Sequence, residues 1–234
     1  MSNEDQLFGK QQADRYDKQW EKLASLNQAL YLLSEIVLNE LPAEAGILCV
    51  GAGTGNELMA LAKKKPDWQF MAVDTSEAML DVCKEKVARA GFLSRCEFHL
   101  GPIDTLPQQV LYDAATSILV SQFYMDKPQR KNFFRAIFGH LKPGAYLISA
   151  DLAAPPDKTT SKSLMDAWFK MHMYAGLSEE LAKNSTSQWG KLAAVLKPSE
   201  VEEIISSAGF RNITQFYQTL FIHSWFAKVP IAKI

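Results

Sequence analysis

Three glycines and one aspartate in this 234-residue chain have the types and the spacing of a nucleotide-binding turn. Gly51, Gly53 and Gly55 alternate with other residues directly after the apolar run 47–50. Glycine lets the backbone turn sharply and lets a ligand approach main chain that side chains would block. Asp74 follows Gly55 by 19 residues, where an acid in nucleotide-binding sheets accepts hydrogen bonds from ribose hydroxyls. The glycines and the acid together predict an adenosine-binding site.

The segments around this turn alternate between expected strands and expected helices. An amphipathic helix at 26–41 ends before Pro42, and short apolar runs then predict buried strands. The five strands are expected at residues 47–50, 69–73, 96–100, 113–120 and 145–150. The helices between them are expected at 57–65, 77–90 and 128–141, the last closed by a turn at 142–144. Strands that alternate with helices form right-handed βαβ units, so the fold class is α/β with a mostly parallel sheet.

The end of the chain departs from this alternation. Helical stretches fill residues 160–208, and residues 212–228 then hold two extended runs with almost no room for a helix between them. Adjacent strands with a short connection pair antiparallel. We therefore expect a Rossmann-like mixed sheet of seven strands, with helices on both faces and a C-terminal antiparallel hairpin.

Composition and charge exclude several classes of protein. The 25 Lys and Arg residues balance 26 Asp and Glu residues, so the net charge of -1 offers no global attraction to nucleic acid or to an anionic membrane. No apolar run approaches the ~20 residues of a membrane span, and residues 1–20 lack the apolar middle of a secretory signal. Cys49, Cys83 and Cys96 form no Cys-x-x-Cys pair and no cluster with histidine, so we expect no disulfide, no metal site and a cytoplasmic location.

Three motifs and the terminal hairpin give the chain a family resemblance. The dinucleotide fingerprint has a third glycine where this chain has Asn56, which disfavours a dinucleotide-dependent oxidoreductase. The runs 47–55, 73–79 and 141–145 instead resemble the first motif, the second motif and the turn before strand five of the class I S-adenosylmethionine-dependent methyltransferases. The resemblance implies a methyltransferase whose cofactor is S-adenosylmethionine.

The resemblance also implies cofactor contacts position by position. The glycine run would follow the methionine part of the cofactor, Asp74 would hold the ribose hydroxyls, and Thr75 and Met79 would border the adenine. Two positions depart from the family pattern. Pro102 stands where many relatives have an acid that reaches the adenine, and Cys49 stands where relatives often have an acid that organises the methionine end. The residues implied to bind the cofactor are Gly51, Ala52, Gly53, Gly55, Asp74, Thr75, Met79, Ile103, Asp104, Val120 and Tyr16.

Acceptor-binding residues and a base are the second part of the implied site. The methyl donor of this family is already activated, so the protein chiefly holds acceptor and methyl in line and a base is optional. Candidate bases are His172, Tyr124 and Asp104. Aromatic residues in the segments outside the core sheet favour a small, partly apolar or cationic acceptor. The residues implied to bind this small-molecule acceptor are Tyr16, Phe123, Tyr124, Trp168 and His172.

We expect a single domain over residues 1–234. It divides into an N-terminal helical cap at 1–41, a cofactor-binding core at 42–151, a helical insertion at 152–197 that forms a lid, and a last helix with the hairpin at 198–234. Nothing in the sequence indicates a membrane or nucleic-acid partner. The oligomeric state is left open, a homodimer included.

Two alternatives to methyl transfer remain open. Residues 171–181 and the terminal hairpin are similar to the carboxy-S-adenosylmethionine synthases, which resemble methyltransferases but carboxylate the methyl of the cofactor. The arginine that binds the extra carboxylate in those enzymes aligns near Gln188, and no arginine lies between Arg135 and Arg211. The second alternative is a non-catalytic protein that keeps the cofactor pocket, which the two departures from the family pattern leave open.

Overall fold

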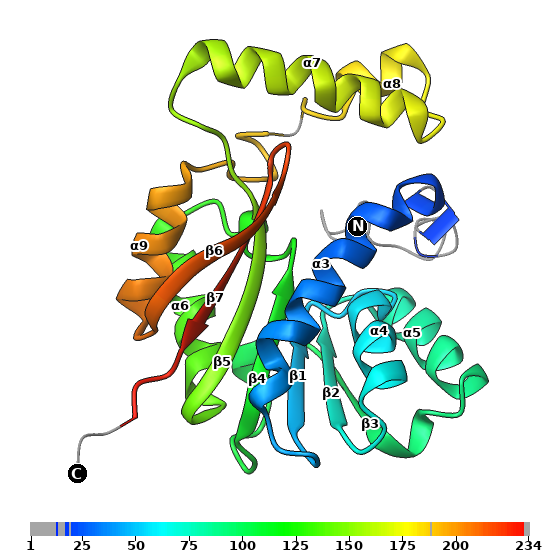
Figure 1. Ribbon diagram of the computed structural model, residues 1–234, viewed down its shortest axis with the longest axis vertical. Helices are drawn as coiled ribbons and strands as arrows, with labels where there is room; N and C mark the ends of the chain where they lie inside the picture. Colours follow the sequence, from blue (N-terminus) through cyan, green and yellow to red (C-terminus); the bar gives the residue numbers. More distant parts are fainter. Residues whose placement is uncertain (1–12, 14–16, 19, 188, 232–234) are drawn as a thin grey trace.

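A seven-stranded sheet forms the centre of the molecule (Figure 1). The computed structural model describes residues 13, 17, 18, 20–187 and 189–231. The strands follow the spatial order β3-β2-β1-β4-β5-β7-β6. The first five run parallel, whereas β7 pairs antiparallel with β5 and β6, which confirms the predicted fold class. The strands are β1 (Gly46–Val50), β2 (Gln69–Asp74), β3 (Cys96–Leu100), β4 (Tyr112–Ile118), β5 (Leu141–Leu152), β6 (Arg211–Thr219) and β7 (Ile222–Lys228).

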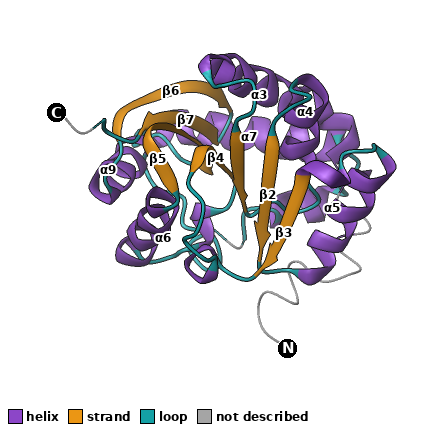
Figure 2. Ribbon diagram, turned by 90° about the horizontal axis from the view of Figure 1, so that it is seen from below, coloured by secondary structure: helices purple, strands orange, loops and turns teal. Residues whose placement is uncertain are grey.

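Helices cover both faces of the sheet (Figure 2). One face carries α3 (Ala24–Val37), α4 (Asn56–Lys64) and α5 (Glu77–Arg89), and the other carries α6 (Lys127–Gly139) and α9 (Pro198–Ala208). Two further helices of the described residues, α7 (Lys158–Tyr174) and α8 (Glu179–Asn184), lie beyond the carboxyl ends of the parallel strands (Figure 1). None of the described helices combines the length and the apolar character that a membrane span requires.

The run of apolar residues in β1 is continuous because both faces of this central strand are buried. Ile47 and Cys49 pack into the core beneath α4 and α5, whereas Leu48 and Val50 pack into the core that Phe134 of α6 shares. A strand covered on both sides has no exposed face to mark with polar residues. This burial pattern places the carboxyl end of β1, and the glycine turn that follows, in the middle of the sheet.

The strand β5 begins earlier than the sequence predicts. The turn expected at residues 142–144 lies inside β5, so that prediction was wrong. Tyr112 pairs with Leu141, and Ala114 then pairs with Tyr146, so the extra residues form a bulge within the strand. The bulge stays in the sheet because the amide of Gly144 donates to the carbonyl of residue 229 at 3.0 Å.

The carboxyl ends of the parallel strands lie at the edge where α7 and α8 pass (Figure 1). The chain leaves β5 at Leu152, forms these two helices and returns to the same place. Ala153 and Leu196 form an isolated β-bridge there, and the amide of Ala154 donates to the carbonyl of Leu196 at 2.9 Å. The insertion therefore begins and ends at one point beside the carboxyl edge, which places its returning residues against any site formed there.

Candidate active site

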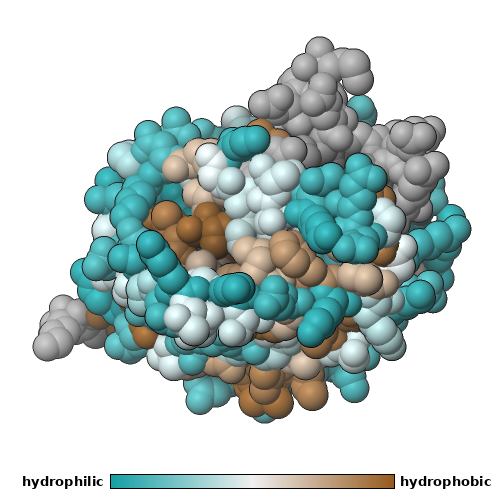
Figure 3. Space-filling view, turned by 90° about the horizontal axis from the view of Figure 1, so that it is seen from above, coloured by the Kyte–Doolittle hydropathy of each residue, from teal (hydrophilic) through white to brown (hydrophobic). Residues whose placement is uncertain are grey.

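A cavity of about 500 Å³ opens at the carboxyl ends of the parallel strands. Small-molecule sites commonly have volumes of ~300–1,000 Å³. The walls come from the segments that follow β1, β2, β3 and β4, from α3, and from residues 191 and 192 of the returning insertion. Figure 3 faces the molecule from the side of α7 and shows hydrophobic residues in a recess with hydrophilic residues around it.

The glycine turn is held against the end of β2 by its own main-chain amides. The amides of Gly51 and Ala52 donate to the carbonyl of Val73 at 2.8 and 3.0 Å, and the amide of Gly53 donates to Oδ2 of Asp74 at 2.7 Å. Gly53 has φ of +54°, which L side chains rarely adopt, and a Cβ placed on it would have no neighbour within 4 Å. Open space therefore lies over this main chain at the cavity wall, as a closely approaching ligand requires.

Asp74 ends β2, and backbone amides fix the orientation of its carboxyl group. Oδ1 accepts a hydrogen bond from the amide of Ser76 at 2.9 Å, and Oδ2 accepts the bond from Gly53. Burial raises the pKa of Asp74, whereas the amides of Ser76, Gly53 and Thr75 act in the opposite direction. Each carboxylate oxygen has two lone pairs, so both oxygens keep capacity for further donors such as ribose hydroxyls.

Most residues predicted for the site line this cavity. They come from the ends of four strands and the segments that follow, and the strand order β3-β2-β1-β4 brings those segments together. The contact that each makes with a cofactor or an acceptor stays a prediction. The predicted residues in the wall are Gly51, Ala52, Gly53, Asp74, Thr75, Met79, Ile103, Val120, Phe123 and Tyr124.

Two residues predicted to bind the cofactor lie outside the wall. Gly55 is behind the turn, where a Cβ would come within 2.4 Å of Sγ of Cys83, so its missing side chain lets α4 approach α5. Asp104 is exposed on the short 3-10 helix Ile103–Thr105, whose Ile103 does line the cavity. A third predicted residue, Tyr16, lies outside the described residues.

Trp168 and His172, predicted to bind the acceptor, are buried residues of α7 and do not line the cavity. The His172 ring lies 4.9 Å from the Trp168 ring and 5.3 Å from the Trp20 ring, and the Trp168 ring lies 5.7 Å from that of Phe221. Neither ring nitrogen of His172 has a hydrogen-bond partner among the described residues, and burial lowers its pKa. This cluster attaches α7 to the hairpin and places the His172 ring away from the cavity.

The wall also contains residues that were not predicted to bind the cofactor or the acceptor. Asn27 and Tyr31 are four residues apart on α3, and this spacing is a signal that could have found them, because such residues share a helix face. Glu57 comes from the first turn of α4. No local pattern marks Lys191 and Leu192, because only the return path of the insertion brings them to the wall. The other additions are Val50, Thr54, Asn56, Val73, Gly101, Pro102, Ile118, Leu119, Met125 and Phe133.

A polar network attaches Asp17, near the start of the chain, to the glycine turn. Oδ1 of Asp17 accepts hydrogen bonds from the Thr54 hydroxyl at 2.8 Å and from the Asn56 amide at 2.9 Å. Lys86 of α5 donates to Oδ2 of Asp17 at 2.8 Å and to Oδ1 of Asn56 at 2.6 Å. Burial tends to raise the pKa of Asp17, but these hydrogen bonds outweigh it and lower that pKa.

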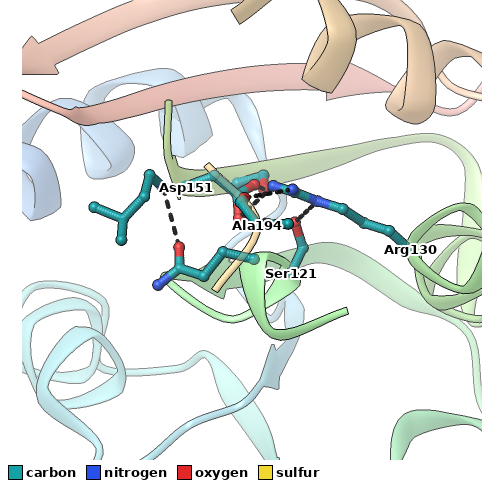
Figure 4. Close-up of polar contacts among 7 residues, drawn as sticks. Ser121, Arg130, Asp151 and Ala194 are labelled. Carbon is teal, nitrogen blue, oxygen red and sulfur yellow. Dashed lines mark hydrogen bonds and ion pairs between the residues drawn. The ribbon is translucent and has the colours of Figure 1, made fainter. Parts of the chain in front are cut away.

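A buried ion pair attaches the returning insertion to the core (Figure 4). Arg130 of α6 and Asp151 of β5 are fully buried, and Nη2 lies 3.0 Å from Oδ1. The Ser121 hydroxyl donates to the same Oδ1 at 2.7 Å and accepts from Nε of Arg130 at 2.7 Å. Nη1 of Arg130 donates to the carbonyl of Ala194 at 3.2 Å, and the Ala194 amide donates to the carbonyl of Gln122 at 2.7 Å. This network sets where the nearby wall residues at 191 and 192 lie.

The amino-acid sequence matches a methyltransferase domain and a group of carboxy-S-adenosyl-L-methionine synthases. A family of methyltransferase domains matches residues 47–144, which include the glycine turn and Asp74. The carboxy-S-adenosyl-L-methionine synthase of Campylobacter curvus is 25% identical over 191 residues, which cover 80% of this chain and 78% of the synthase.

Solved structures share the fold. A S-adenosylmethionine-dependent methyltransferase from Clostridium acetobutylicum has a TM-score of 0.63 and 15% identity, with 93% of this chain and 98% of that chain covered. The apo form of the S-adenosylmethionine-dependent methyltransferase SibL has a TM-score of 0.61 and 18% identity over 85% of this chain. The match covers 55% of SibL, so this chain spans about half of that protein. At these identities the likeness shows the fold alone.

The strand order, the cavity at the carboxyl ends of the strands and the matched domain are similar to those of the class I methyltransferases. The proteins that the chain resembles in sequence or in fold include S-adenosylmethionine-dependent methyltransferases and a carboxy-S-adenosyl-L-methionine synthase. The chain is an enzyme, and S-adenosylmethionine is its cofactor. The residues present fit S-adenosylmethionine. The main chain at Gly53 is open to a ligand, and the carboxylate oxygens of Asp74 can accept hydrogen bonds from ribose hydroxyls. Met79 and Ile103 offer apolar surface for the adenine ring.

Proposed function

We propose that this enzyme transfers the methyl group of S-adenosylmethionine to a small-molecule acceptor. The observation that carries the proposal is that one cavity joins two chemically different walls. Asp74 and Met79 lie in the wall that suits a nucleoside, and Phe123, Tyr124 and Phe133 add an aromatic wall. The rings of Tyr124 and Phe133 have centroids 4.8 Å apart. Aromatic faces favour a flat or cationic acceptor.

The chain would act mainly by holding the reactants. S-adenosylmethionine, when bound, supplies a methyl group that its sulfonium already activates. The protein positions the acceptor in line and keeps water out, which removes much of the entropic barrier. Tyr124 is our first candidate for a base because it lines the cavity, whereas His172 and Asp104 do not. Replacing Tyr124 with Phe therefore tests whether the acceptor needs a base.

We propose that the whole chain works as one domain, with residues 1–41 as a cap and residues 152–197 as a lid. The contacts of Asp17 with Thr54 support the first assignment, and the bond from Arg130 to Ala194 supports the second. Lys191 and Leu192 then close the acceptor side of the cavity.

Carboxy-S-adenosylmethionine synthesis is the second candidate, because relatives that are 22–28% identical bear that name. Lys191 is the only lysine or arginine among the described residues of the cavity wall. A lysine ammonium can replace an arginine as a positive charge that pairs with a carboxylate, although it cannot form the bidentate hydrogen bonds of a guanidinium group. The residue near which the synthase arginine aligns, Gln188, lies outside the described residues.

Calorimetry on the cofactor-stripped protein tests the cofactor site first. We expect S-adenosylmethionine and S-adenosylhomocysteine to bind, NAD not to bind, and Asp74→Ala to weaken both interactions. The matched control is Asp81→Ala on α5, whose carboxylate is exposed and pairs with Lys84 at 3.5 Å. Binding of NAD alone, or of no ligand, would overturn the proposal.

An acceptor screen then separates the candidate functions. Formation of S-adenosylhomocysteine that depends on an added acceptor supports methyl transfer. Mass spectrometry of ligand released from the purified protein identifies a carboxylated cofactor if the second candidate is correct. Cofactor binding without turnover over a broad panel of small molecules would instead indicate a non-catalytic binding protein.

A further inference from the structure

The acceptor side of the cavity is the part of the wall formed by residues 118–125, by Phe133 and by residues 191 and 192. The described residues of this part are apolar or aromatic except for Lys191, and none of them is an acid. Phe123 is 39% exposed and Met125 is 40% exposed, although both are large apolar side chains. Exposed apolar surface within a cavity indicates a ligand with an apolar body.

Lys191 brings a positive charge to this apolar wall, and its side chain is exposed. Other cations attached to segments near the cavity are paired within the protein, Lys86 with Asp17 and Arg130 with Asp151. By contrast, neither an ion pair nor a hydrogen bond joins the Lys191 side chain to any residue that the structure describes. The Lys191 ammonium is therefore available to a ligand.

The turn that carries Lys191 is closed and anchored by contacts of the insertion itself. The amide of Gly190 donates to the carbonyl of Ala193 at 2.8 Å, which closes the turn around residues 191 and 192. Gly190 has φ of +75°, a conformation that glycine adopts without strain. Directly before the turn, the Trp189 ring packs 4.9 Å from the ring of Phe221.

The other end of the turn is bound to the segment that follows β4. The amide of Ala194 donates to the carbonyl of Gln122 at 2.7 Å, and Phe123, the next residue, lines the cavity. Backbone hydrogen bonds thus place the main chain of Lys191 close to the aromatic part of the wall. Its flexible four-carbon stem then lets the ammonium adjust to a ligand that lies on that wall.

The charges of the cavity disfavour a cationic acceptor. Glu57 and Asp74, the acids of the described wall, come from α4 and from the end of β2, on the side of the glycine turn. The sulfonium of S-adenosylmethionine, when bound, adds a positive charge beside the acceptor. A cationic acceptor would thus meet the sulfonium and Lys191 with no acid on its own side, whereas both charges attract an anion.

We propose that Lys191 selects a flat aromatic acceptor that carries a carboxylate. This inference rests on the proposed function and names its substrate class. The ring would lie on the wall formed by Phe123 and Tyr124, and the carboxylate would pair with the Lys191 ammonium. The carboxylate serves only for binding. In the transfer, another atom of the acceptor bonds to the methyl carbon as the carbon–sulfur bond breaks, the sulfonium becomes a neutral thioether, and any proton on the attacking atom is released.

Calorimetry on protein saturated with S-adenosylhomocysteine tests this selection. The probes are hydroxybenzoates, hydroxycinnamates and indole carboxylates, each beside its primary amide, which has nearly the same shape but no charge. At low salt we expect acids to bind about fivefold more tightly than their amides, the effect of one exposed ion pair. Sodium chloride at about 0.5 M should weaken the acids and leave the amides unchanged, because salt screens an exposed pair.

Two variants of Lys191 assign the preference to its charge. Lys191→Met should bind acid and amide equally, whereas Lys191→Arg should keep the preference, because a guanidinium also pairs with a carboxylate. S-adenosylhomocysteine should bind to both variants as it does to the unchanged protein. The matched control is Lys183→Met on α8 of the same insertion, whose side chain is 64% exposed and pairs with Glu179 at 2.6 Å. This control should keep the preference for acids.

The outcomes separate this inference from the proposed function. Equal affinity for acids and amides in the unchanged protein, no binding of any acid, or an unchanged preference in Lys191→Met would overturn the role of Lys191 and leave the cofactor site intact. Failure of S-adenosylhomocysteine to bind would overturn the cofactor site. A carboxylated cofactor released from the purified protein would overturn methyl transfer and this inference with it. The comparison of acid with amide needs no variant, so it decides the question even if the variants fold poorly.

Discussion

The buried pair of Arg130 and Asp151 offers the sharpest test of how the insertion is attached. Replacing Arg130 with Met keeps a side chain of similar length but leaves Asp151 without its cation. Both residues are fully buried, so water cannot compensate. Breaking such a pair costs about 3–5 kcal/mol. For a chain of this size each kcal/mol shifts the melting temperature by roughly 2–4 °C, so we expect Tm to fall by about 6–20 °C.

Urea denaturation at pH 7.5 and thermal melts measure this loss. The control is Lys127→Met on the same helix, whose amine lies 2.6 Å from Glu200 but whose side chain is 51% exposed. Exposed ion pairs contribute only about 0–1 kcal/mol, so this control should lower the free energy of unfolding by no more than that. The double variant Arg130→Met/Asp151→Leu should recover much of the loss, because it removes the unpaired charge.

The mechanism also predicts how the loss depends on pH. Burial raises the pKa of Asp151 while Arg130 opposes that rise, so without Arg130 the carboxyl protonates more readily. The deficit of Arg130→Met should therefore shrink as pH falls. A loss below about 1 kcal/mol at pH 7.5, or no recovery in the double variant, would refute the reasoning that the pair fixes the segment around Ala194.

Three further predictions follow from the cavity. Asp74→Ala should weaken the binding of S-adenosylhomocysteine by roughly tenfold or more in calorimetry, since the carboxylate oxygens of Asp74 are the expected acceptors for two ribose hydroxyls. The pKa of Glu57 rises from 4.5 to about 7 on folding, so the protein should lose about 3 kcal/mol of stability as pH rises from about 4.5 through 7, and urea denaturation of Glu57→Gln should lack this loss. Gly51→Ala should cost about 1–3 kcal/mol in urea denaturation and weaken ligand binding, because φ is +69° and its Cβ would lie 2.3 Å from Cγ2 of Val120.

Local patterns were sufficient for the sheet and for the nucleoside side of the cavity. Apolar runs bounded by glycine, proline and polar turns mark strands wherever both faces are buried, and this holds for β1 and β4. Gly51, Gly53 and Asp74 could be predicted because their role depends on a turn and a strand end a few residues away. Neighbouring parallel strands end at the same edge, so finding the strands also located these residues.

The turn at 142–144 shows where local patterns fail even within the sheet. Proline and glycine there favour a turn, but a hydrogen bond from Gly144 to Val229, which directly follows β7, keeps the segment in β5. That partner is far away in sequence, so only the assembled hairpin decides the outcome.

The acceptor side of the cavity was decided by tertiary structure. Trp168 and His172 have the residue types of a binding site, yet Trp168 packs against Phe221 and His172 packs against Trp20, and neither lines the wall. Lys191 has no distinguishing local pattern, yet the insertion returns it to the wall beside β5. The sequence by itself determined the strands, the glycine turn and the acid after β2, because these depend on neighbours along the chain. The tertiary structure decided which distant side chains meet at the cavity and how deeply an acid such as Glu57 is buried beside it, because burial and pairing depend on segments brought together only by folding.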